Sequence, residues 1–302
     1  MKPLAEALVA WLLALLLALT RLMGPGAASA FGGHLLRLLG PLTRRQRQMM
    51  QAIALAFPDR DAAWHRRIAL EAWENLGRTA CEYAHLARLA DAVVVDEASR
   101  AAMARLQAEQ RPVLVFAAHL ANWELPAVVA QRLHPRNAVL YRTPNNRRVA
   151  EMVLRMRSPL MGRLIPATLA APIALAQALE EGYSIGMLVD QHFSRGPRAR
   201  FFGQPVQANP LLPRLARRHG AALYGIRAVR ISGWRHRVVL EGPFELPRDA
   251  AGEVDVPATT QMMLDAIERW VRENPGQWLW QHRRFREAPP AAQAPSDPAR
   301  PA

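Results

Sequence analysis

A histidine and a glutamate five positions apart stand where an apolar run gives way to a new apolar pattern. VLVFAAHLANWELPAVV (113–129) is apolar as far as His119, and Glu124 follows within the second pattern. On one continuous helix the two side chains would point about 140° apart, so they can meet only if His119 lies in a turn. Glu124 would then hydrogen-bond one imidazole nitrogen and make the other more basic, which favours general-base chemistry. The alternative of a capping histidine and an exposed helix glutamate stays open, because the spacing alone is a weak motif.

The elements around this pair predict an α/β fold. Strands alternating with helices are typical of a central mixed, largely parallel sheet flanked by helices. In such sheets, sites gather at the carboxyl ends of the strands, and the following helix N-terminus attracts anions. His119 is expected at such a strand end. The predicted strands are 113–118, 137–142, 183–190, 221–230 and 236–242, and the predicted helices are 59–90, 121–132, 171–181, 210–220 and about 257–273.

The N-terminus is a hydrophobic segment. LAEALVAWLLALLLALTRLM (4–23) has about the length that a helix needs to cross a bilayer. We predict that residues 1–30 form a hydrophobic membrane-anchor helix, transmembrane or monotopic. A cleaved secretory signal, favoured by AASA (27–30), and a buried core helix stay open as alternatives. Positive residues after the segment favour a cytoplasmic position for the rest of the chain, and they are Arg37, Arg44, Arg45 and Arg47.

The amino-acid composition limits the kinds of partner and site that the protein can have. The 302 residues include 39 basic and 25 acidic ones, for a formal net charge of +14. Such a charge suits an anionic partner, which could be a nucleic acid, an anionic lipid surface or a phosphorylated substrate. The hydrophobic N-terminus and the lack of a recognised nucleic-acid motif argue against nucleic acid. The single cysteine, Cys81, excludes an intramolecular disulfide framework and a Cys-rich zinc site.

Two other patterns could supply a nucleophile, and both are weak. GYSIG (182–186) matches the nucleophile-elbow pattern around Ser184, but that elbow must follow a strand and precede a helix. Here it follows a predicted helix and opens a predicted strand. Cys81 and His85 share a helix face, where a lone thiol is usually a small buried hydrophobe. Neither pattern therefore offers a convincing nucleophile for a covalent enzyme intermediate.

Wider motifs carry a resemblance to a known family. HLANWE (119–124) resembles the His-x4-Asp/Glu motif of the lysophospholipid acyltransferase superfamily. More narrowly, it is similar to the lipid A biosynthesis acyltransferases, the late lauroyl and myristoyl transferases of Gram-negative bacteria. The likeness runs in the family's order over about residues 30–287. Its further blocks are 56–82, LYRTPNNRRV (140–149), GMLVDQHFSRG (186–196) with FFGQPVQANP (201–210), and NPGQWLWQHRRFR (274–286).

This resemblance implies a function and a set of site residues. It implies a bacterial inner-membrane enzyme with its catalytic domain (31–287) facing the cytoplasm. The enzyme would move a fatty acyl chain from acyl carrier protein to a hydroxyl of a lipid A precursor, with no metal or organic cofactor. Carried over by motif, His119 and Glu124 are the catalytic pair. The substrate-binding candidates are Arg142, Asp190 and Gln191. An acyltransferase for another membrane lipid (glycerolipid, aminoacyl lipid or glycolipid) stays open, because the motif activates any hydroxyl.

Several side chains keep two interpretations at this point. Arg142 could bind a substrate phosphate or pair with Asp190. Backbone N–H groups near 120–122 could stabilise the oxyanion of the transition state. The aromatic and basic residues of the C-terminal block suit either a membrane interface or the core, and they are Trp278, Trp280, His282, Arg283 and Arg284. A basic face formed by Arg214, Arg217 and Arg218 could meet an anionic lipid or the carrier protein, or simply be solvated. The Pro/Ala-rich tail 288–302 is expected to be disordered.

Overall fold

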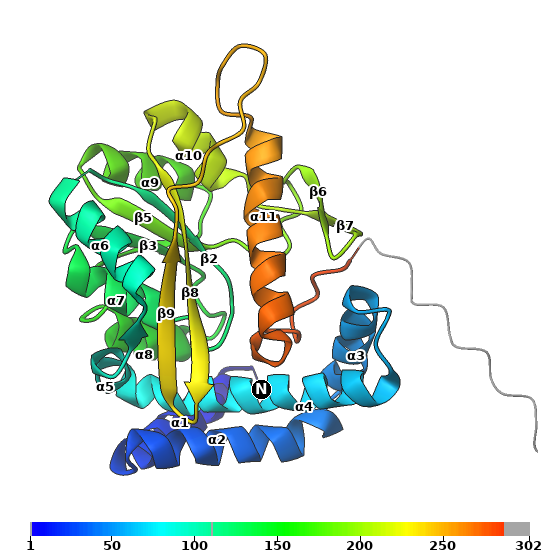
Figure 1. Cartoon of the computed structure of the whole chain (residues 1–302). Helices are drawn as coiled ribbons and strands as arrows, with labels where there is room; N and C mark the ends of the chain where they lie inside the picture. The colour runs from blue at the N-terminus through cyan, green and yellow to red at the C-terminus, as the bar shows by residue number, and fades with distance from the viewer. Residues whose placement is uncertain (1, 110, 287–302) are drawn as a thin grey trace, which may run out of the picture.

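A seven-stranded mixed sheet forms the centre of the molecule (Figure 1). The computed structural model describes residues 2–109 and 111–286. The strand order is β1-β9-β8-β2-β5-β3-β4, and every neighbouring pair is parallel except β8 and β9. This confirms the predicted largely parallel sheet. The strands are β1 (Val94–Val95), β2 (Leu114–Ala117), β3 (Asn137–Tyr141), β4 (Arg163–Pro166), β5 (Ser184–Leu188), β8 (Leu223–Ser232) and β9 (Arg235–Glu241).

Helices cover both faces of the sheet. The buried residues of α9, α10 and α11 pack with Leu114 and Phe116 on one face. Those of α5, α6 and α7 pack with Val113 and Ala117 on the other face (Figure 1). Alternate residues of β2 thus enter two different apolar layers, as the two-residue period of a strand requires. The helices are α5 (Leu86–Asp91), α6 (Glu97–Glu109), α7 (Leu125–Leu133), α8 (Arg147–Arg157), α9 (Ala171–Glu180), α10 (Leu211–His219) and α11 (Val256–Glu273).

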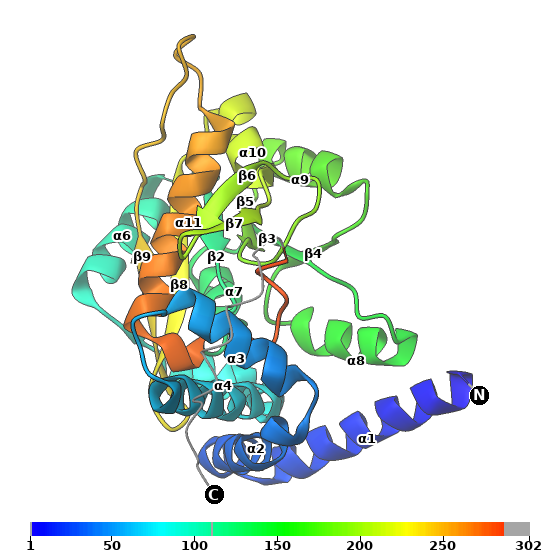
Figure 2. The same cartoon turned by 90° about the vertical axis from the view of Figure 1, so that its right-hand side faces the viewer.

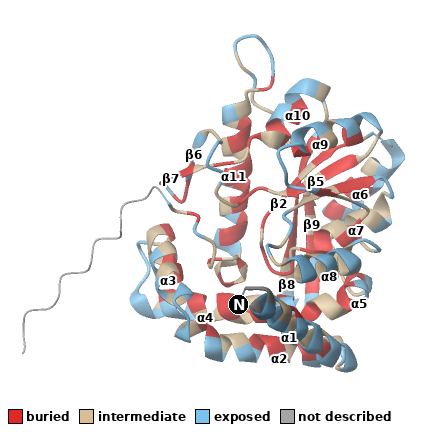
Figure 3. Ribbon diagram, turned by 180° about the vertical axis from the view of Figure 1, so that it is seen from behind, coloured by how far each residue is buried: buried red, intermediate tan, exposed pale blue. Residues whose placement is uncertain are grey.

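Four more helices precede the sheet: α1 (Lys2–Leu22), α2 (Pro25–Leu39), α3 (Arg45–Ala56) and α4 (Ala62–Glu82). The backbones of α2 and α4 approach closely, because a Cβ added to Gly32 would lie 2.2 Å from the carbonyl oxygen of Gly77. Helix α1 points away from this pair (Figure 2). Its surface is mostly exposed or half-buried (Figure 3).

The N-terminal prediction is confirmed only in part. A helix forms at the expected place, but the structure contains, within the residues it describes, no helix with the length and apolarity of a membrane span. The transmembrane form of the anchor is therefore not confirmed. The boundary drawn at residue 30 falls inside α2, where Ala28 and Ser29 are fully buried against the rest of the protein.

The predicted elements of the catalytic region are confirmed in type, with one informative difference. The helix expected over 59–90 is broken, because α4 ends at Glu82 and a 3-10 turn, Tyr83–His85, precedes α5. Asp61 caps α4, accepting a hydrogen bond from the Trp64 N–H at 2.7 Å. Elements without a prediction include α3, α6, α8, β1, β4 and the hairpin of β6 (Arg198–Phe201) and β7 (Gln204–Gln207). The tail predicted to be disordered, 288–302, lies outside the described residues.

Candidate active site

His119 lies in the turn between β2 and α7, as the sequence predicted. Ala121 in this turn adopts a left-handed backbone with φ +48, and its N–H donates to the Gln277 carbonyl at 2.8 Å. The carbonyl of His119 accepts from the Leu279 N–H at 3.0 Å. The C-terminal segment therefore holds the turn from one side. Within the turn, the N–H of Leu120 donates to the Ala118 carbonyl at 2.7 Å.

The imidazole of His119 is oriented by Asp190, which follows β5. His119 Nδ1 lies 2.7 Å from Asp190 Oδ1. Since an ionised carboxylate only accepts hydrogen bonds, Nδ1 carries the proton and Nε2 is left as the acceptor. Asp190 Oδ2 accepts from the His119 backbone N–H at 2.9 Å and from Trp278 Nε1 at 2.8 Å.

The buried carboxyl of Asp190 remains ionised. Burial alone would raise its pKa, but the attraction of His119 and the three hydrogen bonds outweigh burial and lower the pKa to about 2. The pairing follows from the sheet. Ala117 of β2 and Leu188 of β5 are in register in parallel neighbours, so the residues two positions beyond each come together.

Glu124 does not make the predicted contact with the imidazole. Its buried carboxylate accepts hydrogen bonds from the Tyr83 hydroxyl and from Arg157, with Arg157 Nε at 2.9 Å. Arg157 Nη2 also donates to the Tyr83 hydroxyl at 2.8 Å. The orienting carboxylate of His119 is thus Asp190, and Glu124 belongs to a second, adjacent cluster. The break between α4 and α5 brings Tyr83 into this cluster.

The other substrate-binding candidates lie near the same histidine. Gln191 Nε2 lies 3.2 Å from His119 Nε2. Arg142 is exposed and lines the same cavity as His119. The alternative salt bridge between Arg142 and Asp190 is wrong: Asp190 is 2% exposed and bonds to His119 and Trp278. Arg142 forms no ion pair among the described residues.

The C-terminal block belongs largely to the core. Trp278 and Trp280 are 2% and 0% exposed, so for them the membrane-interface interpretation is wrong. Arg284 is buried as well and donates to the carbonyls of Gln191 and Gln207 at 3.2 and 2.6 Å. The block therefore supports the segment after β5 through these hydrogen bonds. This role was not predicted from the sequence. Arg283 is exposed.

The weak nucleophile candidates are engaged elsewhere. Ser184 opens β5 at the end opposite to Asp190, and its Oγ accepts from the Val113 N–H at 3.2 Å. Cys81 is buried, and burial raises the pKa of its thiol, which disfavours the reactive thiolate. His85 Nε2 lies 2.8 Å from the Thr20 carbonyl, so this imidazole is bound to the end of α1.

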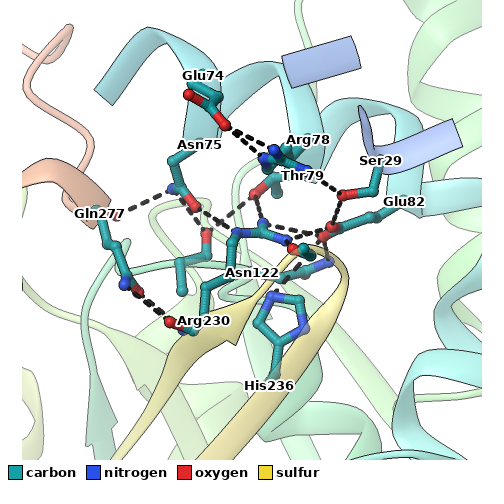
Figure 4. Close-up of polar contacts among 12 residues, drawn as sticks. Ser29, Glu74, Asn75, Arg78, Thr79, Glu82, Asn122, Arg230, His236 and Gln277 are labelled. Carbon is teal, nitrogen blue, oxygen red and sulfur yellow. Dashed lines mark hydrogen bonds and ion pairs between the residues drawn. The ribbon is translucent and has the colours of Figure 1, made fainter. Parts of the chain in front are cut away.

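A buried polar network holds the catalytic turn to α4 and the β8–β9 hairpin (Figure 4). Asn75 and Thr79 donate to the carbonyl of Ala121 at 3.3 and 3.0 Å. Asn122 Nδ2 donates to the fully buried Glu82 at 2.9 Å. These contacts satisfy the carbonyl of the residue with the unusual φ, and they tie the turn to the helical layer.

The charge of Glu82 is balanced within the same network. Arg230 forms an ion pair with it, and Ser29 Oγ of α2 donates to Glu82 Oε1 at 2.7 Å (Figure 4). Burial would raise the pKa of Glu82, but Arg230 outweighs it and lowers the pKa. The neighbouring His236 is buried beside this cation, and its pKa falls to about 4, so the imidazole is neutral near pH 7.

An apolar cavity of about 520 Å³ opens beside His119. Polar side chains stand around one end of it, at the carboxyl ends of the strands. The walls between the two ends are mostly apolar and come from the sheet and from α6 and α7. A second set of polar residues, which includes Arg111, Asn137 and Ser184, lies towards the amino ends of the strands. The polar residues at the first end are His119, Glu124, Arg142, Arg157 and Gln191, and the walls include Val113, Val115, Val139, Gly186, Met103 and Leu106.

An imidazole held by a buried carboxylate beside a long apolar cavity is the arrangement of an enzyme acting on a hydrocarbon-bearing substrate. The model of the family described as bacterial lipid A biosynthesis acyltransferase matches residues 2–287, and the chain belongs to this family. The family membership confirms the resemblance inferred from the motifs. It makes the chain an acyltransferase of lipid A biosynthesis and disfavours the nucleic-acid-binding alternative.

Two curated relatives agree with this assignment. The chain is 28% identical over 262 residues to the lipid A biosynthesis palmitoleoyltransferase of Escherichia coli (strain K12). It is equally similar to a lipid A biosynthesis acyltransferase of Shigella flexneri. Each alignment covers 82% of this chain and 81% of the relative.

Proposed function

We propose that this acyltransferase moves a fatty acyl chain from acyl carrier protein to a hydroxyl of a lipid A precursor, with His119 as general base. The observation that carries the proposal is the contact of His119 Nδ1 with Asp190, which leaves Nε2 as the acceptor beside the apolar cavity. The cavity suits an alkyl chain. His119 lines one end of it, so the thioester group of a chain bound there would lie next to the base. Because the acceptor oxygen attacks the thioester directly, no enzyme residue has to carry the acyl group.

The reaction proceeds in two proton-coupled steps. His119 Nε2 takes the proton of the acceptor hydroxyl, and the oxygen attacks the thioester carbonyl, so that a C–O bond forms. The C–S bond then breaks, and the imidazolium returns its proton to the leaving thiolate. Asp190 stays ionised throughout, since its pKa is about 2, and it stabilises the imidazolium.

Two of the backbone N–H groups expected near 120–122 are not free to bind the oxyanion. The N–H groups of Leu120 and Ala121 are already bonded to carbonyls. The Gln191 side-chain amide lies beside Nε2 of the base, and we assign it to the developing oxyanion. Glu124 acts by holding Arg157 at the cavity, where the guanidinium attracts anionic groups of the substrates. Arg142, exposed at the same end, binds a phosphate of the acceptor.

Helices α1 and α2 bring the site to the cytoplasmic face of the bacterial inner membrane. They expose a row of large apolar side chains, which include Leu8, Trp11, Leu15, Leu19 and Leu38. Arginines follow directly, and together they suit an anionic membrane surface. Helix α1 also contacts α8 near the cavity, with Asn146 Nδ2 donating to the Glu6 carbonyl at 2.7 Å. A lipid acceptor held at the surface would therefore meet the site without leaving the membrane.

A detergent-solubilised assay with purified full-length protein tests the proposal. It supplies mixed acyl carrier protein thioesters and a purified tetra-acylated lipid A precursor, and mass spectrometry reads the product. We expect a mass gain of one acyl chain, lost in His119→Gln and in Glu124→Ala. Glycerolipid acceptors are offered in parallel. Acylation of those lipids alone, by a folded enzyme, would contradict the lipid A acceptor.

A further inference from the structure

One glycine interrupts the apolar wall of the cavity. Residues of β2, β3 and β5 line it, and Gly186 of β5 is in register with Val115 on one side and Val139 on the other. The wall therefore carries a row of valine, glycine and valine across three adjacent strands. A strand places side chains of such a row on the same face. The missing side chain is the one in the middle.

The cavity reaches this row. Val115, Gly186 and Val139 are all half-buried although they lie in the middle of the sheet. Their neighbours on the opposite face, Leu114 and Ile185, are 0% exposed. Open space therefore lies over the glycine on the cavity face only.

Neither the backbone nor close packing requires a glycine here. Gly186 is not among the positive-φ residues of the described chain. An added Cβ would meet Val139 Cγ2 at 3.9 Å and the Ala138 carbonyl at 4.0 Å, which is ordinary contact. Gly225 of β8 differs, because an added Cβ would lie 2.8 Å from the Phe116 ring. The consequence of a glycine at 186 is thus empty volume inside the cavity.

We propose that Gly186 determines the length of acyl chain that the enzyme accepts, an inference that rests on the proposed function. Gly186 lies four residues before Asp190, about 13 Å along the strand at ~3.3 Å per residue. An acyl chain whose thioester carbon is at His119 passes over Gly186 on its way to the far part of the cavity. That far part is lined by Val113, Met103 and Leu106. A side chain at 186 would block the passage there and leave the first part of the chain unaffected.

Substitutions of increasing size test this inference. Gly186→Ala, Gly186→Val and Gly186→Leu are assayed with an equimolar mixture of acyl carrier protein thioesters from decanoyl to hexadecanoyl. We expect the product to shift stepwise to shorter chains. The ratio of long to short product should fall about tenfold or more with valine, because hydrophobic pockets discriminate a methylene by ~10-fold or more. The loss of rate should grow with the length of the acyl chain.

Two further variants separate a blocked cavity from a damaged fold. Val139→Ala in the Gly186→Val background returns space to the row and should restore longer chains. Ile185→Val alters the opposite face of the same strand, in the core and outside the cavity. It should lower the melting temperature without changing the preference. An equal loss for all chain lengths, or an unchanged preference in a folded Gly186→Leu, would overturn the inference.

A binding measurement keeps the two proposals apart. Fatty acids of graded length displace a fluorescent fatty acid from the full-length protein in detergent, which reads the cavity without acyl transfer. A wild type that transfers no chain but shows the shift towards shorter fatty acids with Gly186→Val would contradict the proposed function and support the role of Gly186. Equal displacement profiles for wild type and Gly186→Leu would contradict that role.

Discussion

His119 Nδ1 and Asp190 Oδ1 lie 2.7 Å apart, although the two residues are separated by 71 positions in the chain. The contact is made where two parallel neighbours, β2 and β5, end side by side. It fixes the tautomer of the histidine and makes Nε2 the atom that accepts a proton.

Asp190→Asn should lower kcat by roughly 10²–10⁴, since the amide neither stabilises the imidazolium nor enforces the tautomer. Steady-state kinetics against His119→Gln measures the effect, and the two losses should be similar. Asp255→Asn is the matched control, because Asp255 only caps α11 by accepting from the Ala258 N–H. Asparagine caps as well as aspartate, so this variant should keep its activity. Near wild-type turnover in folded Asp190→Asn would contradict the assignment of the base.

The low pKa of Asp190 predicts an acid-dependent stability. Its folded pKa, about 2, is below the ordinary value of 3.8, so its ionised form stabilises the fold above about pH 4. That contribution, roughly 2 kcal/mol, is lost as the pH falls from about 4 through about 2. The free energies of unfolding of wild type and Asp190→Asn, measured at graded pH, should therefore converge in acid. Parallel stability curves over this range would show that the carboxyl is not held ionised.

Glu124 should act through Arg157 rather than through the histidine. Glu124→Gln leaves a largely buried guanidinium without its anion, which should cost about 3 kcal/mol of stability and much of the activity. A double-mutant cycle of Glu124→Gln and Arg157→Gln should show coupling of ~1 kcal/mol or more. In the cycle of Glu124→Gln with Asp190→Asn, the two changes in the free energy of unfolding should be nearly additive. Strong coupling in the second cycle and none in the first would return Glu124 to the role of orienting His119.

Glu82→Gln should disturb both stability and catalysis, although Glu82 does not line the cavity. The change leaves Arg230 buried beside a neutral amide, with an expected cost of about 3 kcal/mol. It also weakens the bond that Asn122 makes to hold the catalytic turn. Glu74→Gln is the matched control, because its pairs with Arg37 and Arg78 are part-exposed and worth up to ~1 kcal/mol. Equal effects of the two variants on melting temperature and kcat would argue against the network.

Binding to anionic vesicles should depend on the exposed side of α1. Trp11→Ser and Leu15→Ser remove apolar side chains that are 61% and 41% exposed, so the melting temperature in detergent should change little. Each should weaken vesicle binding about tenfold, since a buried large side chain contributes ~1.5–3 kcal/mol. Co-sedimentation measures this, with Leu19→Met as a conservative control. Unchanged binding of the double serine variant would place the membrane contact elsewhere on the protein.

Sequence patterns predicted β2, β3, β5, β8 and β9 and most of the helices that pack on them, but not α3, α6, α8, β1, β4 or the β6–β7 hairpin. The apolar run before His119 predicts β2, because a central strand is buried on both faces. The helix predicted to end at residue 220 does end there, because Gly220 follows α10 in the left-handed conformation that glycine favours. The motif residues at the ends of two strands marked both His119 and Asp190. The two residues could have been paired from the sequence only if β2 and β5 were known to be neighbours. The alternation of strands and helices along the chain does not give the strand order.

The partners of the site residues were decided by tertiary structure. Glu124 is near His119 in sequence, yet it bonds to Tyr83 and Arg157, which arrive from other helices. Trp278 looked equally suited to a membrane interface, and only the packed core shows that its indole donates to Asp190. Local periodicity states which face of an element is apolar. The strand order and the packing of distant segments determine which polar groups meet, because those contacts depend on how the whole chain buries its apolar faces.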